Sequence, residues 1–338
     1  MVNKSVRQSW RERATRYMGC QSEGGESIKA VPPRTKVTGQ TGPAAPARSL
    51  YICAFAARGA TPATPMRRLS LALAPFFRSF LALCIALSAG AARAAPTSLL
   101  LEEFTWTELR DALRGGATTL IIPVGGTEQN GPHMVLGKHN LRAKLLATRI
   151  AAELGKTIVA PVIAYVPEGR IDPPAGHMRF PGTISVSDEA FRGVLEGAAR
   201  SFRRAGFRDI VLLGDSGNYQ TALQGVAGKL SREWAASNVR VHFIGEYYRA
   251  TQGPYIEALR AKGLSDAQIG THAASADTSL LWALDPAGVR AGQLTLGDEP
   301  SSGVAGDPRA ASAALGNIGV ELIVARSVAA IRRAIARL

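Results

Sequence analysis

The chain has 338 residues, 46% of them hydrophobic, and a formal net charge of +14 at pH 7. The positive charge is concentrated toward the N-terminus: residues 1–94 hold 14 Lys and Arg against 3 Asp and Glu, and the remainder holds 26 against 23. The remainder has no basic face interleaved with aromatic residues, so the composition argues against a nucleic-acid partner.

Two N-terminal segments precede the predicted folded body. Residues 1–65 lack sustained hydrophobic periodicity and are predicted to be disordered or to lie upstream of the true start codon. Residues 66–94 have a basic start, an apolar core and a small-residue end, which predicts a secretory signal peptide and an exported, periplasmic or secreted protein. The alternative is a membrane span, but Arg78 leaves an apolar run shorter than the ~20 residues that a bilayer requires. We therefore expect no stable membrane span after cleavage.

Residues 95–338 are predicted to form a single α/β domain. Apolar, β-branched runs alternate with helical patterns, which predicts strands at 118–124, 157–163, 209–213 and 239–244 and helices at 141–154, 188–205 and about 220–236. This alternation is typical of a parallel sheet with helices on both faces. Asn140 and Ser187 are the predicted N-caps of the first two helices, Gly206 is predicted to end the second, and Leu141, Leu145 and Ile150 are predicted to form the inward stripe of the first. In such sheets, functional residues gather in the loops that follow the carboxyl ends of the strands.

Two of these loops are rich in polar residues. The loop after the first strand contains Glu128, His133 and His139 among several glycines, and the loop "GDSGNYQ" contains Asp215 and Ser216. Carboxylates and imidazoles together are ligands that suit Zn, Mn or Fe. Each residue also has a structural interpretation: Glu128 as a loop cap, His133 as a turn or core histidine, and His139 as a partner of a helix cap.

Two further segments contribute polar side chains. "GHMRFPGTISVS" contains His177 and Thr183, and "GTHAASADTSLLWALDP" contains His272 and Asp277. A loop histidine and a helix N-cap are the structural interpretations of His272 and Asp277. Ser216 stands on a strand-to-helix turn, where a serine becomes a nucleophile if a histidine reaches it.

Four blocks in this order resemble the creatininase (creatinine amidohydrolase) family of metal-dependent hydrolases. They are "GGTEQNGPHMVLGKH" at 125–139, "FPGTIS" at 180–185, "FRDIVLLGDSGNYQTAL" at 207–223 and "HAASADTS" at 272–279. The resemblance implies a three-layer α/β/α domain with a mainly parallel sheet, a small-molecule amide substrate and a homo-oligomer, as a hexamer. These properties are expectations from the resemblance.

The resemblance also places the family's metal-ligand positions on Glu128, Asn130, His139 and Ser216, of which only Glu128 keeps the family residue. Sliding the third block by one residue would put Asp215 in the place of Ser216. A neutral imidazole offers one lone pair, so His139 cannot bridge two ions as a carboxylate does. We therefore expect one divalent metal ion (Zn, Mn or Fe), held by Glu128, His139 and Asp215.

The resemblance assigns the general acid/base to His272, which matches a family histidine that handles protons. The residues predicted to line the pocket are Asn130, His133, His177, Thr183, Ser216, Asn218 and Asp277. The leading hypothesis is an exported amidohydrolase in which metal-activated water attacks a small, possibly cyclic amide. The alternatives are a non-catalytic small-molecule-binding protein of the same fold and a hydrolase that uses Ser216 with His272.

Overall fold

The structure, a computed structural model, describes residues 98–297 and 299–336. The predicted disordered segment 1–65 and the predicted signal peptide 66–94 lie outside the described residues. Both therefore stay predictions.

A four-stranded parallel sheet forms the centre of the described domain. Its strands are β1 (Thr119–Val124), β2 (Thr157–Val159), β3 (Asp209–Gly214) and β4 (Arg240–Phe243), in the spatial order β2-β1-β3-β4. The second strand is shorter than predicted, although an isolated parallel bridge joins Val124 to Ile163 beyond its end. β1 and β3 are paired over their whole lengths, with Val124 opposite Gly214, so the loops that follow them leave the sheet side by side.

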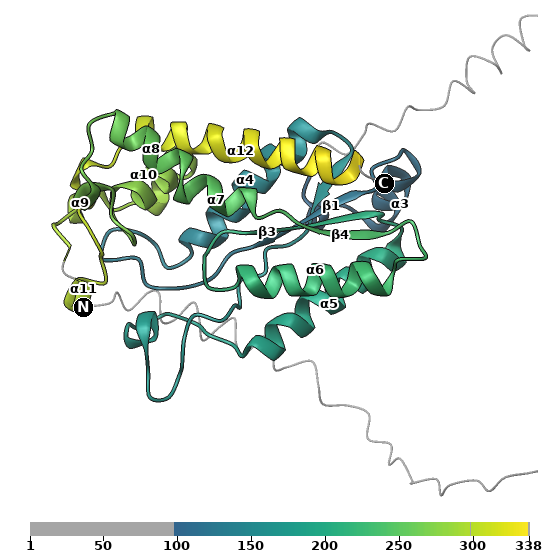
Figure 1. Cartoon of the computed structure of the whole chain (residues 1–338), viewed down its shortest axis with the longest axis horizontal. Helices are drawn as coiled ribbons and strands as arrows, with labels where there is room; N and C mark the ends of the chain where they lie inside the picture. The colour runs from purple at the N-terminus through teal and green to yellow at the C-terminus, as the bar shows by residue number, and fades with distance from the viewer. Residues whose placement is uncertain (1–97, 298, 337–338) are drawn as a thin grey trace, which may run out of the picture. The chain divides into compact units, whose positions relative to one another are not determined.

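Helices cover both faces of the sheet, which confirms the predicted three-layer α/β/α fold (Figure 1). One face packs against α3 (Trp106–Arg114), α5 (Asp188–Ala205) and α6 (Gln220–Glu233). The other packs against α4 (Lys138–Leu154), α7 (Glu246–Gln252), α8 (Pro254–Ala261), α10 (Ser275–Leu284) and α12 (Ala313–Ala336). The shorter elements are η1 (Leu101–Glu103), η2 (Gly176–Arg179), α9 (Asp266–Ile269), η3 (Pro286–Gly288), η4 (Ala291–Gln293), α11 (Glu299–Ser302) and η5 (Pro308–Ala310).

The alternation of side chains along β1 explains why both faces are apolar. Leu120 and Ile122 point into the core shared with α5 and α6, whereas Ile121 points into the core shared with α4 and α12. A strand buried on both faces reads as a continuous apolar run, which is the pattern "TLIIPV". The sheet therefore holds the ends of β1 and β3 rigidly between two cores.

Two helix boundaries show how the local sequence sets the elements around the sheet. The side chain of Ser187 accepts a hydrogen bond from Ala190 N–H at the start of α5, and Gly206 ends that helix in the left-handed conformation, as predicted. The predicted N-cap of α4, Asn140, is wrong, because α4 begins two residues earlier, at Lys138. The Asn140 side chain instead accepts from Gly126 N–H and ties the first loop to the helix.

The buried face of α4 also differs from the predicted stripe. Leu141 and Leu145 are only half-buried, and the buried face contains Arg142, Leu146 and Ile150. The buried face of α4 therefore carries a cation, Arg142, on the same side of the helix as the core residues Leu146 and Ile150.

Helix α12 is long and apolar enough to cross a membrane by its length and composition, with a mean hydropathy of 1.5 over its most apolar window. Half of that window is buried in this structure, where α12 packs against α10, α7 and α4. Close packing depends on Gly319, because a Cβ atom there would lie 2.6 Å from a methyl carbon of Leu280. In this structure α12 is a core helix of the domain.

Candidate functional site

A polar cavity of about 210 Å³, called the chamber below, lies beyond the carboxyl ends of β1 and β3. Eight of the predicted site residues line it: Glu128, His139, His177, Asp215, Ser216, Asn218, His272 and Asp277. The other walls include Lys138, Arg142 and Tyr248, which the sequence analysis did not single out. The parallel register of β1 and β3 explains this convergence, since it brings two loops about 90 residues apart in sequence to one edge of the sheet.

The three predicted pocket residues that do not line the chamber stabilise the loops around it. Asn130 is fully buried, and its amide group donates to the backbone carbonyls of Glu128 and Val135. His133 is fully buried and hydrogen-bonds Thr278 at 3.0 Å, which fits the turn or core interpretation. The hydroxyl of Thr183 accepts from Gln129 N–H and donates to His177 C=O. These contacts fix the backbone on either side of Glu128.

The predicted metal ligands Glu128, His139 and Asp215 do meet, but as a hydrogen-bonded chain. His139 Nε2 lies 2.9 Å from Glu128 Oε1, and His139 Nδ1 lies 2.6 Å from Asp215 Oδ2. Asp215 also accepts from Tyr247 OH at 2.7 Å and lies 3.2 Å from Arg142 Nε. Both ring nitrogens of His139 are therefore engaged, and neither offers a metal ion a lone pair in this arrangement.

The protonation of this chain follows from its charges. Burial and Lys138 favour the neutral imidazole, but the carboxylates of Glu128 and Asp215 outweigh them and raise the pKa of His139. Burial alone would raise the pKa of Glu128, yet His139 and Lys138 hold it well below its ordinary range. Each ring nitrogen of His139 faces a carboxylate oxygen, an arrangement that suits the protonated imidazolium and not the neutral, metal-ligating form.

Two buried cations complete the charge network. Lys138 is 1% exposed, and its ammonium lies 3.5 Å from Glu128 and 3.2 Å from Asp277. Arg142, one helical turn later, lies 2.8 Å from the other oxygen of Asp277. Burial would raise the pKa of Asp277, but the two cations hold it far below its ordinary value. Three carboxylates thus face three positive groups, so this part of the site is neutral by itself.

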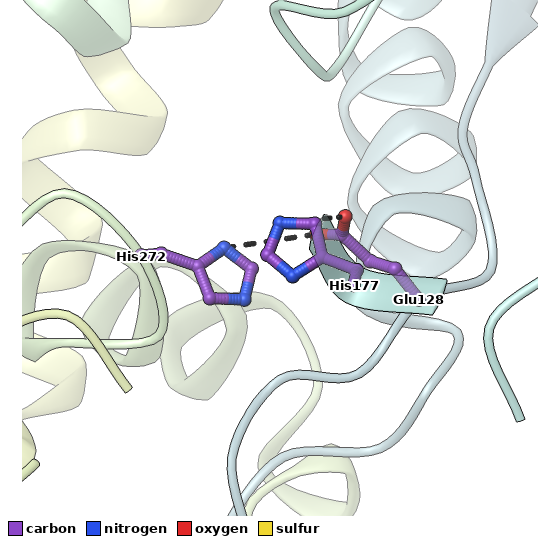
Figure 2. A group of neighbouring side chains, drawn as sticks. All are labelled: Glu128, His177 and His272. Atoms are coloured by element: carbon purple, nitrogen blue, oxygen red, sulfur yellow. Dashed lines mark ion pairs between the residues drawn. The ribbon is translucent and has the colours of Figure 1, made fainter. Parts of the chain in front are cut away.

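A second group of metal-ligand atoms faces the same carboxylate of Glu128. Glu128, His177 and His272 each offer one atom, and these atoms lie within 4.8 Å of one another. Figure 2 shows the two imidazole rings next to each other, with their centroids 4.3 Å apart, beside the carboxylate of Glu128. His177 Nε2 is 3.7 Å from Glu128 Oε2, and His272 Nδ1 is 3.8 Å from Glu128 Oε1.

Gln129 sets the orientation of both rings. Its amide oxygen accepts from Gly131 N–H and its amide nitrogen donates to Gly303 C=O, which fixes the orientation of the amide group. The same nitrogen lies 2.8 Å from His177 Nδ1. His272 Nε2 lies 3.1 Å from Gln129 C=O, to which it donates. These assignments place the proton of His272 on Nε2 and leave its Nδ1 lone pair facing the carboxylate of Glu128.

A cation fits between Glu128 and His272. Burial and Lys138 lower the pKa of His272 to about 4, so its ring is neutral at pH 7. The Nδ1 lone pair of His272 and the Oε1 oxygen of Glu128 are both acceptors, and they face each other across 3.8 Å with no hydrogen between them. A cation between the two atoms would remove this repulsion. His177 is the third possible ligand, since its Nε2 lies 3.7 Å from the other carboxylate oxygen of Glu128. The donor set of this site therefore differs from the predicted one in two of three residues.

The backbone of the His272 loop is held in an unusual conformation. Ala273 has φ of +53°, and His272 forms an antiparallel bridge with Ala305. The carboxylate of Asp277 accepts a hydrogen bond from Ala273 N–H at 3.1 Å. The charge network and the loop that carries His272 are therefore coupled through Asp277.

Glu168 is a further site residue that the sequence analysis missed. It is 4% exposed, accepts from Asn218 Nδ2 at 2.9 Å and lies close enough to Glu128 for the two carboxyl groups to affect each other's protonation. Gly126, with φ of +147°, makes room for it, since a Cβ atom there would lie 2.5 Å from Glu168 Oε1. Burial and the neighbouring Glu128 raise the pKa of Glu168 to about 8. Its only sequence signal is an acid shortly after a predicted strand.

This raised pKa predicts the pH dependence of stability. The ordinary pKa of the group is 4.5, so between pH 4.5 and about 8 the native state holds a proton that the unfolded chain releases. The Glu168 contribution to the free energy of unfolding therefore decreases as pH rises through that window, and Glu168→Gln removes the decrease. Urea unfolding in chelator at pH 5 to 8, with exposed Glu153→Gln as the control, measures it. Parallel curves for wild type and Glu168→Gln would contradict the prediction.

The Ser216 hypothesis has no support from the hydrogen bonds of the described residues. Ser216 lines the chamber and its backbone N–H donates to Tyr219 OH, but no hydrogen bond joins its hydroxyl to a histidine. Of the two neighbours in the third block, Asp215 is the one that contacts His139. The chemistry of the chamber therefore rests on its carboxylates and imidazoles.

A parallel sheet lies between two layers of helices, and carboxylates and imidazoles gather at the carboxyl ends of its strands. These features define an α/β protein with a polar ligand-binding site. A family model described as creatininase, creatinine amidohydrolase, matches residues 102–331. The chain belongs to the creatininase family, as its four sequence blocks predicted.

Individual relatives agree with this assignment. The chain is 30% identical over 131 residues to creatinine amidohydrolase of Pseudomonas putida, covering 39% of this chain and 49% of that protein. It is 32% identical over 123 residues to 3-dehydro-scyllo-inosose hydrolase of Thermotoga maritima, covering 36% and 37%. It is 28% identical over 232 residues to the mycofactocin precursor peptide peptidase of Mycobacterium tuberculosis H37Rv, covering 59% and 78%. The first two matches span less than half of each relative.

Solved creatininase structures share the fold. A tryptophan variant of creatininase superposes with a TM-score of 0.62 at 24% identity, covering 70% of this chain and 99% of that one. A manganese creatininase gives a TM-score of 0.58 with the same identity and coverage. At this identity the likeness establishes the architecture of the domain.

Proposed function

We propose that this protein hydrolyses a C–N amide bond of a small molecule, with one divalent cation held by Glu128, His177 and His272. The observation that carries the proposal is the convergence of these three side chains in the polar chamber. One carboxylate and two imidazoles are a donor set that suits Zn, Mn or Fe. The names of the relatives support the reaction class, since they denote a creatinine amidohydrolase, a hydrolase and a peptidase.

The cation would lower the pKa of a water molecule and polarise a carbonyl group. The chain's own residues prepare the chamber for this. His139 and Lys138 keep Glu128 ionised at neutral pH, and Gln129 holds His272 in the tautomer that points a lone pair inward. Ser216 and Asn218 line the chamber and provide polar groups that can hydrogen-bond an amide.

Elemental analysis and hydrolysis assays on the same purified protein test this proposal. We expect about one divalent ion per chain and hydrolysis of small linear or cyclic amides that is lost on chelation and returns with Zn, Mn or Fe. His177→Ala is expected to lower metal occupancy, because it removes one ligand of three. Hydrolysis at an unchanged rate by metal-free protein would exclude the proposal.

A second candidate function is small-molecule binding without catalysis. The neutral network of Lys138, Arg142 and His139 with three carboxylates favours it, because the chamber's charges are already balanced without an added ion. Under this alternative the purified protein contains no metal and binds small amides without turnover. Metal-dependent turnover in the assay above would exclude it.

Export and self-association are further proposals about the whole chain. The pattern at 66–94 supports export after signal cleavage, and family membership supports a homo-oligomer. N-terminal sequencing of protein recovered from outside the cytoplasm, and light scattering of the purified chain, test the two proposals. An uncleaved intracellular protein or a monomer would contradict them.

A further inference from the structure

A small pocket, called the Arg179 pocket below, adjoins the chamber. Its volume is about 90 Å³, and it shares His177 and His272 with the chamber. Its other walls include Gln129, Arg179 and Phe180. Both shared histidines belong to the candidate metal site, so a ligand at that site lies next to the Arg179 pocket.

Arg179 supplies the positive charge of this pocket. It lies two residues after His177 in η2, and its side chain is exposed. Its Nε donates to the backbone C=O of Gly176 at 3.3 Å, which orients the guanidinium group. Within the part of the chain that the structure describes, no carboxylate forms an ion pair with Arg179. Its other guanidinium N–H groups are therefore available to a ligand.

Arg179 differs in this respect from the cations of the chamber. Lys138 lies 3.2 Å and Arg142 lies 2.8 Å from the carboxylate of Asp277, so both are already paired. Glu128 faces the two shared histidines, but Lys138 and the proposed cation offset its charge. The pocket therefore offers an anion one unpaired positive charge beside the metal site.

The size of the pocket limits that anion. A water molecule takes up about 30 Å³ in the liquid, so a pocket of about 90 Å³ holds roughly three heavy atoms, the number in a carboxylate group. A planar guanidinium group binds a carboxylate through two parallel N–H···O hydrogen bonds. A carboxylate on a short linker thus fits both the volume and the donor.

We propose that Arg179 binds a carboxylate of the substrate, so that the substrates are amides that carry a carboxylate close to the amide bond. The choice of an amide rests on the proposed hydrolysis. The chamber would hold the amide itself, and Arg179 would select among amides by their charge. Arg179 is then a specificity residue that takes no part in the chemical step.

Two pairs of small amides test the proposal with the metal-loaded full chain. N-acetylglycine carries a carboxylate on the amine side of the amide and succinamic acid carries one on the acyl side, and N-acetylglycinamide and succinamide are their neutral counterparts. Binding is measured by calorimetry at low ionic strength, and hydrolysis is measured separately. At least one anion is expected to bind roughly fivefold or more tighter than its neutral counterpart, and the difference should shrink in about 1 M salt.

Two substitutions connect that preference to Arg179. Arg179→Gln removes the charge and is expected to abolish the preference, while the neutral amides bind within about twofold of wild type. Arg179→Glu is expected to reverse the preference, in favour of the cationic N-acetylethylenediamine. Thermal melts and elemental analysis are expected to show that both variants keep their fold and metal. The reversal is a result that damage to η2 would not produce.

Arg170→Gln is the matched control. Arg170 is also exposed, lies in the same segment between β2 and α5, and donates from its Nε to Pro173 C=O. It lines neither the chamber nor the Arg179 pocket. Its replacement is therefore expected to leave the preference for anions unchanged.

The outcomes separate this inference from the proposed function. Equal binding of each anion and its neutral counterpart, or a preference for anions that survives in Arg179→Gln, overturns Arg179 as a specificity residue even if amides are hydrolysed. A preference that depends on Arg179, without turnover under any metal condition, supports the Arg179 pocket and removes the proposed hydrolysis.

Discussion

Arg142→Met is expected to lower the free energy of unfolding by about 3–5 kcal/mol, because it leaves the network of three carboxylates with only two positive groups, Lys138 and His139. Arg142 is 2% exposed and forms ion pairs with Asp215 at 3.2 Å and Asp277 at 2.8 Å. Methionine has a similar length and good helix propensity, so the loss reports the charge and not the shape. Urea unfolding at pH 7 measures the change.

Arg149→Met on the same helix is the control. Arg149 is exposed, so its replacement is expected to change stability by less than about 0.5 kcal/mol. The Arg142→Met deficit should shrink as pH falls below about 4. The pKa of Asp277 is depressed in the native state, so its stabilising contribution is present above the ordinary value of 3.8 and is lost at lower pH. A deficit equal to that of Arg149→Met would show that the network contributes little.

Adding Asp277→Asn to Arg142→Met separates charge from packing. Removing the excess negative charge should restore part of the lost stability, so the double variant is expected to be more stable than the sum of the single changes predicts. Recovery should be incomplete, because the neutral amide that replaces the carboxylate would no longer form an ion pair with Lys138. Additive losses would mean that Arg142 and Asp277 act independently.

The fold was predictable because its signals are local. β1 and β3 are buried on both faces, so their apolar runs mark them within one residue, and α5 begins at a serine cap and ends at a glycine. In the predicted stripe of α4, Ile150 was correct, whereas Leu141 and Leu145 were wrong because the helix buries Arg142 and Leu146 instead. Arg142 lies four and eight residues before Leu146 and Ile150, so it lies on the same helix face as these core residues. This spacing was the signal in the sequence that Arg142 is buried.

The sequence indicated which residues lie in the site, but not which of them contact one another. Loops after neighbouring parallel strands must converge, so Glu128, His139 and Asp215 were correctly expected to lie together. Which of them face a ligand depends on side chains elsewhere in the sequence. Lys138 is paired with Asp277, 139 residues later, and Gln129 with His272, 143 residues later. No local pattern encodes such contacts, so the assignment of the metal ligands to His139 and Asp215 stays a prediction.

These pairings give Glu128 two roles in one side chain. Its Oε1 oxygen is hydrogen-bonded to His139 at 2.9 Å and lies 3.5 Å from Lys138, and these contacts stabilise the fold. The same carboxylate faces His177 and His272, with which it would hold the proposed cation. Substitutions of the two histidines therefore test metal binding alone, whereas a substitution of Glu128 tests both roles at once.

Glu128→Gln is expected to lower metal occupancy from about one ion per chain to a small fraction and to reduce kcat/KM for amide hydrolysis by roughly 10³-fold or more. An amide keeps the shape of the side chain but removes the charge that attracts a divalent ion, and enzymes lose catalysis on this scale when a charge at the reaction centre is removed. Elemental analysis and initial rates on the same preparation measure both effects.

His272→Ala separates metal binding from folding in this prediction. Glu128→Gln should also lower stability, because Lys138 and His139 lose a buried partner, whereas His272→Ala should lower metal occupancy and activity with a smaller effect on stability. Exposed Glu153→Gln is expected to match wild type in all three measurements. If Glu128→Gln keeps its metal and its activity, the cation does not sit between Glu128 and the two histidines, and the charge network alone defines the chamber.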